Sequence, residues 1–256
     1  MEYSEISYKK TSLSKVIVRI DFFEFIDNRI LFGLSVMTEL MRSFPKKGMQ
    51  QIVRFNTMDI MINQGNSQAE NSTKDGVRQE FCNADENKII LANKYIALEL
   101  NKYTSYEEEF EKFIPILRAI MAEMPLTALR IGIRYINEYG SSKHIKIQKG
   151  FFTSPVSAFA DNKILCAENI SPIRAMAMYE YAFEDMRLNF RYGQYNPLYP
   201  QPLKQANFVL DYDCYCDTPI NGLESILEHV NKGHKVIQEL FEKTITEKLR
   251  VVMRDE

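Results

Sequence analysis

A strict alternation of apolar and polar side chains, repeated along the chain, is the feature that most constrains the fold. The segment 129–139 (LRIGIRYINEY) shows it most clearly, because Arg130 and Arg134 share one face and the apolar residues between them share the other. A period of two is typical of a β-strand with one buried face. Similar runs predict strands at Val16–Phe25, Gln51–Asn63, Val77–Cys82, Lys88–Ala92, Tyr95–Leu100, Arg174–Phe183, Met186–Tyr192 and Asn207–Cys216, with weaker signals at His144–Gln148 and Lys163–Ala167.

Helical spacing of apolar residues marks a second kind of segment. Three such stretches are predicted as long helices, at Leu31–Phe44, 106–124 and Gly222–Met253. Ser105 and Glu108 form a capping box at the start of the second, and Pro115 inside it is expected to bend it. Thr244 and Glu247 fit another capping box, so the last helix has a candidate interruption there.

The order of these elements predicts an α+β fold with mainly antiparallel sheet or sheets packed against three long helices, the longest at the C-terminus. The polar, turn-rich stretch Gly65–Gly76 (GNSQAENSTKDG) is predicted to be a mobile hairpin loop. A single domain over 1–256 is expected, and two sub-lobes at 1–140 and 141–256 are the alternative.

Composition narrows the class of protein. The 256 residues are 45% hydrophobic and 26% charged, which excludes bulk disorder and fibres. With 32 basic against 34 acidic residues, the chain lacks the cationic excess of a protein that coats nucleic acid. No apolar run is long enough for a transmembrane helix, and the first residues do not fit a secretion signal, so a cytoplasmic protein without membrane contact is expected.

Cysteine and histidine spacing predicts no metal site. Cys214 and Cys216 form a C-x-C pair, but no second pair completes a tetrahedral zinc site. His229 and His234 are five residues apart, which does not match the i,i+4 spacing of helical metal ligands. The thiols are therefore predicted to be reduced and buried, and His234 to be a core residue of the last helix.

Alternation places charged residues together on one predicted sheet face. The candidate anion- or ligand-binding residues are Arg130, Arg134, Arg187, Arg191, Asp211 and Asp213. If their strands are neighbours, the guanidinium groups form an anion or nucleic-acid groove, since arginine matches phosphate geometry. The carboxylates, with Glu99, are alternatively a divalent-cation site. The interpretation favoured here is a lattice of cross-strand arginine–carboxylate pairs.

Tyrosines gather in the third quarter of the chain. Tyr192, Tyr195 and Tyr199 are the candidate interface residues, because tyrosine and arginine are enriched where proteins meet. Stacking on bases is a second use of such rings, and core filling is the plainest one. The turn at 193–202 is expected to hold the most exposed members of the group.

Several segments together resemble a known family. They are ALELNKYTSYEEEF at 97–110, RIGIRYIN at 130–137, LDYD at 210–213, HKVI at 234–237, Phe241-Glu242 and Ile245-Thr246. In these segments the chain resembles a sporadically distributed family of bacterial and archaeal proteins of about this length, defined by sequence and not by activity. The resemblance implies no reaction, cofactor or catalytic residue. Patchy distribution implies an association with mobile or defence-related loci, such as toxin–antitoxin systems.

These observations lead to three functional hypotheses. The first is a cytosolic binding protein without catalysis, cofactor or metal, acting through a protein partner or as a homodimer. It is preferred because no catalytic motif accompanies the dense tyrosine and arginine segments. The second is a nucleotide- or RNA-binding protein, with or without nuclease activity, that uses the arginine-lined sheet face. The third is a cavity protein for a small apolar ligand, formed by a curved sheet around the last helix.

Overall fold

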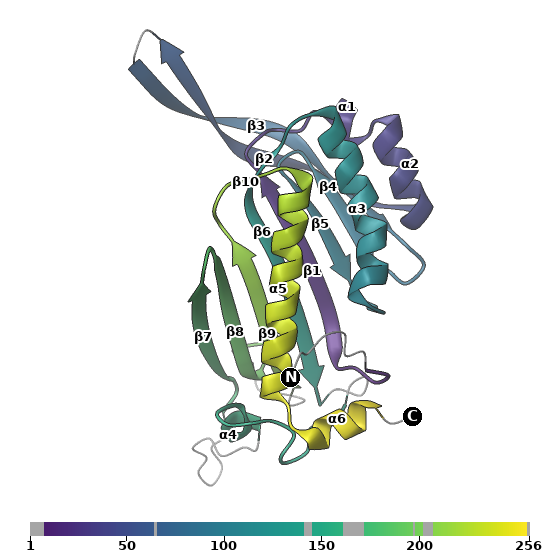
Figure 1. Cartoon of the computed structure of the whole chain (residues 1–256), viewed down its shortest axis with the longest axis vertical. Coiled ribbons are helices and arrows are strands. Elements are labelled where there is room, and N and C mark those ends of the chain that lie inside the picture. Colours follow the sequence, from purple (N-terminus) through teal and green to yellow (C-terminus); the bar gives the residue numbers. More distant parts are fainter. Residues whose placement is uncertain are drawn as a thin grey trace. The chain divides into compact units, whose positions relative to one another are not determined.

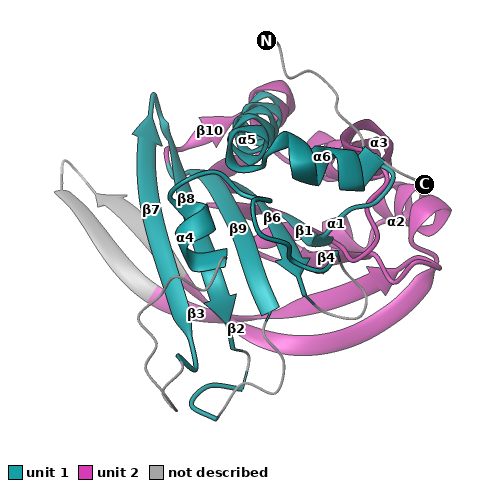
Figure 2. Ribbon diagram, turned by 90° about the horizontal axis from the view of Figure 1, so that it is seen from below, with its two compact units in different colours: residues 1–17, 132–217, 228–256 teal, residues 18–131, 218–227 magenta. Residues whose placement is uncertain are grey.

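The structure is a computed structural model that describes residues 8–63, 66–140, 145–160, 172–196, 198–201 and 207–254. The chain forms two compact units (Figure 2). Unit 1 comprises Met1–Ile17, Gly132–Asp217 and Glu228–Glu256, and unit 2 comprises Val18–Ile131 and Thr218–Leu227. Both units therefore take residues from before and after position 140.

The strands confirm the predicted α+β class with a large antiparallel sheet. Their bounds are β1 (Leu13–Phe22), β2 (Lys46–Asn63), β3 (Asn66–Cys82), β4 (Lys88–Ala92), β5 (Tyr95–Leu100), β6 (Thr127–Tyr139), β7 (Ala175–Phe183), β8 (Met186–Tyr195), β9 (Asn207–Cys216) and β10 (Ile220–Asn221) (Figure 1). Residues 145–148 belong to no strand, and His144 and Lys163–Ala167 lie outside the described residues.

The helices differ from the prediction of three long ones. They are α1 (Asn28–Leu31), α2 (Leu34–Ser43), α3 (Tyr106–Glu123), α4 (Val156–Ala160), α5 (Leu223–Thr244) and α6 (Glu247–Arg254). The longest is α5 with 22 residues, as predicted near the C-terminus. The first predicted helix is broken at Gly33, the N-cap of α2, and the last is broken after Thr244, where the second capping box was expected. Short interruptions thus turn two long helices into four elements.

Unit 2 contains β2-β3-β4-β5 and, next in the strand order, residues 18–22 of β1 and 127–131 of β6, with β10 on β6. The predicted loop at Gly65–Gly76 is wrong, since β2 and β3 pair from Asn63 opposite Asn66 onward. Continuous cross-strand pairing supplies the backbone hydrogen bonds that overrule the turn propensity of these polar residues. Helix α3 begins at the Ser105 cap, whose side chain accepts a hydrogen bond from the Glu108 amide.

Unit 1 contains residues 13–17 of β1 and 132–139 of β6, followed in the strand order by β9-β8-β7, with β7 at the outer edge (Figure 1). The part of α5 in this unit packs on one face of the sheet. At Gly233 the helix approaches so closely that a Cβ atom would lie 2.7 Å from Ile133 Cγ2 and 3.5 Å from Cys214 Sγ. His234, predicted as a core residue, is half-buried, and its Nδ1 lies 2.9 Å from the Tyr135 hydroxyl. The apolar stripe of α5 therefore closes the core of unit 1.

No helix in the described part of the chain is long and apolar enough to span a membrane.

Candidate interaction surface

The sheet of unit 1 has two chemically different faces. Residues directly opposite each other in an antiparallel pair share a face. Tyr179 lies opposite Phe190, and Phe190 opposite Tyr212, on the face that α5 covers. Arg191 lies opposite Asp211 on the other side. We call the first the aromatic face. The second is the polar face, which carries Arg134, Met176, Met178, Arg187, Asn189, Arg191, Asp211 and Asp213.

One carboxylate joins three strands on the polar face. Arg134 on β6 forms a bidentate ion pair with Asp211 on β9, at 2.7 Å from Nε to Oδ1 and 2.8 Å from Nη2 to Oδ2. Arg191 on β8 contributes Nη2 at 3.0 Å from the same Oδ2. The Asp211 side chain is only 9% exposed, whereas each guanidinium side chain is about one-third exposed. The carboxylate holds the pKa of Arg134 above its ordinary value.

The other predicted charges of this set are spread further apart. Arg187 is 59% exposed and reaches Asp217 only at 3.8 Å. Asp213 is half-buried and lies opposite Asn189, so the pairing of β8 with β9 brings it onto the same face as Asp211. Arg130 belongs to unit 2, where it is half-buried. The structure thus brings Arg134, Arg191 and Asp211 into one cluster, while Arg187 and Asp213 flank it.

This arrangement resembles the predicted lattice of arginine–carboxylate pairs more than an anion groove. An anion site needs guanidinium groups whose charge faces the ligand. Here Asp211 forms ion pairs with both Arg134 and Arg191, so their charge is directed at this carboxylate. Asp213 and Asp217 add further negative charge nearby. The RNA-binding hypothesis therefore gains no support from these contacts.

The three tyrosines proposed as interface residues have different environments. Tyr192 is 1% exposed and packs in the aromatic face against Phe159 and Phe190, at centroid distances of 5.2 and 5.0 Å. It is a core residue, and burial raises the pKa of its hydroxyl. Tyr195 and Tyr199 are 43% and 50% exposed. The guanidinium of Arg174 lies 4.1 Å above the Tyr199 ring.

The strand β7 carries a surface that the sequence interpretation did not single out. Within the described residues it pairs only with β8 and ends the strand order. Its sequence, AMAMYEYAF, contains a single charge and no proline. Met178 is 59% exposed, and Tyr179 and Tyr181 are 42% each. The register with β8 has no bulge from Ala175 to Phe183.

Natural proteins protect edge strands with lysine, proline, bulges or covering segments. The strand β2, which ends the order in unit 2, has such features. It begins with Lys46 and Lys47, and its register with β3 shifts between Lys47 and Gln50. Strand β7 contains no lysine or proline and pairs without a bulge. In the described part of unit 1, β7 is thus a regular and largely apolar edge strand that has neither of the protective features of β2.

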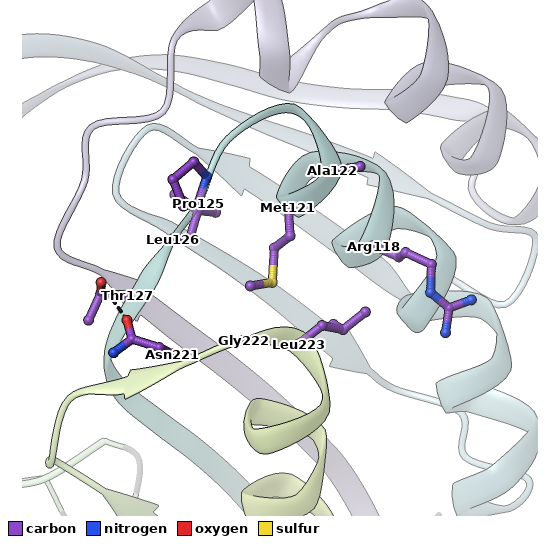
Figure 3. Close-up of a pocket in the computed structure, with 9 residues that line it drawn as sticks. All are labelled: Arg118, Met121, Ala122, Pro125, Leu126, Thr127, Asn221, Gly222 and Leu223. Atoms are coloured by element: carbon purple, nitrogen blue, oxygen red, sulfur yellow. Dashed lines mark hydrogen bonds between the residues drawn. The ribbon is translucent and has the colours of Figure 1, made fainter.

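Two pockets test the hypothesis of a small apolar ligand. In unit 2, a pocket of about 370 Å³ lies beneath α3 (Figure 3). Met121 extends from α3 toward the segment of Gly222 and Leu223, and Thr127 and Asn221 at the rim bond to each other at 2.8 Å. In unit 1, a pocket of about 230 Å³ is lined by Tyr179 and Tyr181 of β7 among others. Ligand sites combine apolar lining with several convergent polar groups. The polar side chains that line the unit 2 pocket are Arg118 and the Thr127–Asn221 pair, which bond to each other, so these polar groups do not converge on a ligand position.

Comparison with protein-family models finds no matching family, and a search of curated proteins finds no matching sequence.

Proposed function

We propose that this chain is a cytosolic binding protein without catalysis whose working form is a homodimer joined through β7. The observation that carries the proposal is the regular, apolar edge of β7. Exposed strand edges offer a row of backbone donors and acceptors that another strand satisfies. A second copy of β7 is the occupant we propose, because the strand is complementary to itself.

Self-complementarity follows from pairing the strand about its midpoint, Tyr179. A two-fold axis perpendicular to the sheet pairs two copies antiparallel and keeps each face on its own side. In that register Phe183 faces Ala175 of the second copy, and Tyr181 faces Ala177. Met176 faces Ala182 in the same way. Outside the three central residues, each large side chain therefore meets a small one.

Charge is also compatible with this register. The single acidic residue, Glu180, faces Met178 of the second copy and not another Glu180. Like charges directly opposite each other would destabilise the pair. Nine residue pairs in an antiparallel ladder provide about eight to ten backbone hydrogen bonds.

The dimer would present two polar faces on one side of a continuous sheet. Each would carry its own cluster of Arg134, Asp211 and Arg191. A bivalent surface increases the apparent affinity for a partner that reaches both copies. We propose that the protein partner expected from the sequence binds there.

The test is the molar mass in solution, measured by light scattering after size exclusion. The wild-type chain should elute at twice its mass of 29.9 kDa. Tyr179→Lys should weaken the dimer about 30-fold, because it removes the central ring pair and opposes two lysines, a loss of about 2 kcal/mol.

Met178→Lys is the matched control, since it changes an adjacent, exposed residue of the same strand to the same charge. In the proposed register the introduced lysine would face Glu180 of the second copy, so the dimer should persist. A monomeric wild type, or equal weakening by both variants, would remove the proposal.

A further inference from the structure

Three potential metal ligands converge at one end of the unit 1 sheet, away from the polar face cluster. Asp185 lies in the turn between β7 and β8, Cys216 is the last residue of β9, and His229 is on α5. One carboxylate oxygen, the sulfur and one ring nitrogen all lie within 4.8 Å of one another. The fold brings these atoms together from positions up to 44 residues apart.

The spacing of these atoms is close to that of a tetrahedral zinc site. Zinc–ligand distances of about 2.0–2.3 Å place neighbouring ligand atoms roughly 3.3–3.8 Å apart. His229 Nε2 and Asp185 Oδ2 are now 2.8 Å apart and share a hydrogen bond. Separating them by about half an ångström, and moving Cys216 Sγ inward by up to about one ångström from the 4.8 Å limit, would bring the three atoms to these distances. Side-chain rotation alone supplies movements of this size.

The three side chains differ in how far they are exposed to solvent. Cys216 is fully buried, the His229 side chain is 14% exposed, and the Asp185 side chain is 38% exposed. An ion would therefore enter from the Asp185 side. Lys232 contacts Oδ1 of Asp185 at 3.3 Å and also pairs with Glu184. Lys232 contacts Oδ1, whereas His229 contacts Oδ2 of the same carboxylate. Lys232 would therefore orient Asp185 by a hydrogen bond from outside the coordination shell, as is common for metal-binding side chains.

We propose that Asp185, Cys216 and His229 bind one Zn²⁺ ion, with a water molecule as the fourth ligand. A mixed sulfur, nitrogen and oxygen set is the chemistry that zinc prefers, and three protein ligands plus water describe an open site. Binding releases the proton of the Cys216 thiol to solvent. The proton that His229 Nε2 shares with Asp185 also passes to solvent, and a neutral ring takes one up at Nδ1, so His229 binds the ion through Nε2 as the Nδ1–H tautomer. No oxidation or reduction occurs. The proposal does not depend on pairing of β7.

Cobalt(II) serves as the probe, because it replaces zinc and reports thiolate ligation by a charge-transfer band in the near ultraviolet. The reduced, full-length chain is titrated with CoCl₂ and then with ZnCl₂. The wild type should bind one Co²⁺ per chain with this band, and Zn²⁺ should remove it. Zn²⁺ should also raise the Tm of the wild type, since it prefers the folded state.

Variants assign the ligands. Cys216→Ser should abolish the band. Asp185→Asn and His229→Gln should each weaken binding by more than about 10-fold, because even outer-shell changes cost 10- to 100-fold. Cys214→Ser is the matched control, being a buried cysteine two residues away that lies outside the group, and it should keep the band. Asp185 lies in an exposed turn, so its variant reports on binding even if a cysteine variant fails to fold.

No band in the wild type, or a band that survives Cys216→Ser and disappears in Cys214→Ser, would overturn the proposal.

Discussion

Replacing Asp211 by asparagine removes the charge that holds Arg134 and Arg191 together. The amide keeps the size of the side chain but turns an NH₂ group toward two guanidinium groups. Breaking a buried ion pair by removing one partner costs about 3–5 kcal/mol. Water reaches about one-third of each arginine side chain, so we expect the lower end, about 3 kcal/mol. For a chain of this size that corresponds to a fall in Tm of about 6–12 °C.

The assay is thermal unfolding followed by circular dichroism, with Asp213→Asn as the matched control. Asp213 is two residues away on the same strand and face, but it is half-buried and lies opposite Asn189. Asp213→Asn should lower the free energy of unfolding by less than about 1 kcal/mol. If Asp211→Asn melted within about 1 °C of the wild type, or no lower than Asp213→Asn, the polar cluster would not hold the three strands together as argued.

Two further predictions concern particular residues. Gly193→Ala should lower the free energy of unfolding by about 2–3 kcal/mol, because at φ +139° the added Cβ would lie 2.1 Å from the Ala175 carbonyl oxygen. The first amides of β7 should then exchange their hydrogens faster. Gly150→Ala is the control, and since its Cβ meets open space it should lower the free energy of unfolding by only about 1 kcal/mol. As the pH falls, the Tm of Glu80→Gln should decrease less than the Tm of the wild type. Burial alone would raise the pKa of Glu80, but hydrogen bonds from Arg78 and Lys88 hold it below its ordinary value of 4.5, so its contribution is present above that pH and is lost as the pH falls through the lowered pKa. Equal melting profiles for the two proteins between about pH 6 and pH 3 would contradict this assignment.

Alternation was sufficient to predict the faces of the strands but not their neighbours. Arg191 and Tyr192 are adjacent, and a period of two already places Tyr192 with the buried Phe190 and Arg191 with the charged residues. The pairing of Asp211 with arginines from two other strands depends on the strand order, which no local pattern contains. The exposed edge of β7 was missed for the same reason, because its composition suits a central strand equally well.

Long-range contacts also explain why the sequence analysis placed a loop at Gly65–Gly76 and did not find the group of Asp185, Cys216 and His229. The stretch at Gly65–Gly76 is rich in turn-forming residues, yet most of it forms β3 because β2 provides a paired partner along its length. The group of Asp185, Cys216 and His229 lacks any recognisable sequence spacing, since each residue comes from a different element. A carboxylate, a thiol and an imidazole at the ends of neighbouring predicted elements would have been the only available signal.

Disulfide trapping at the midpoint of β7 tests the homodimer most directly. In the proposed register, two copies of Tyr179→Cys would have Cα atoms about 4.5–5.5 Å apart, within the range of a disulfide. Two copies of Ala175→Cys would be separated by about eight residues of strand, roughly 26 Å. Under mild oxidation, with the wild type as the control for its native cysteines, Tyr179→Cys should form a covalent dimer and Ala175→Cys should not. Equal trapping at both positions, or none at position 179, would contradict the account.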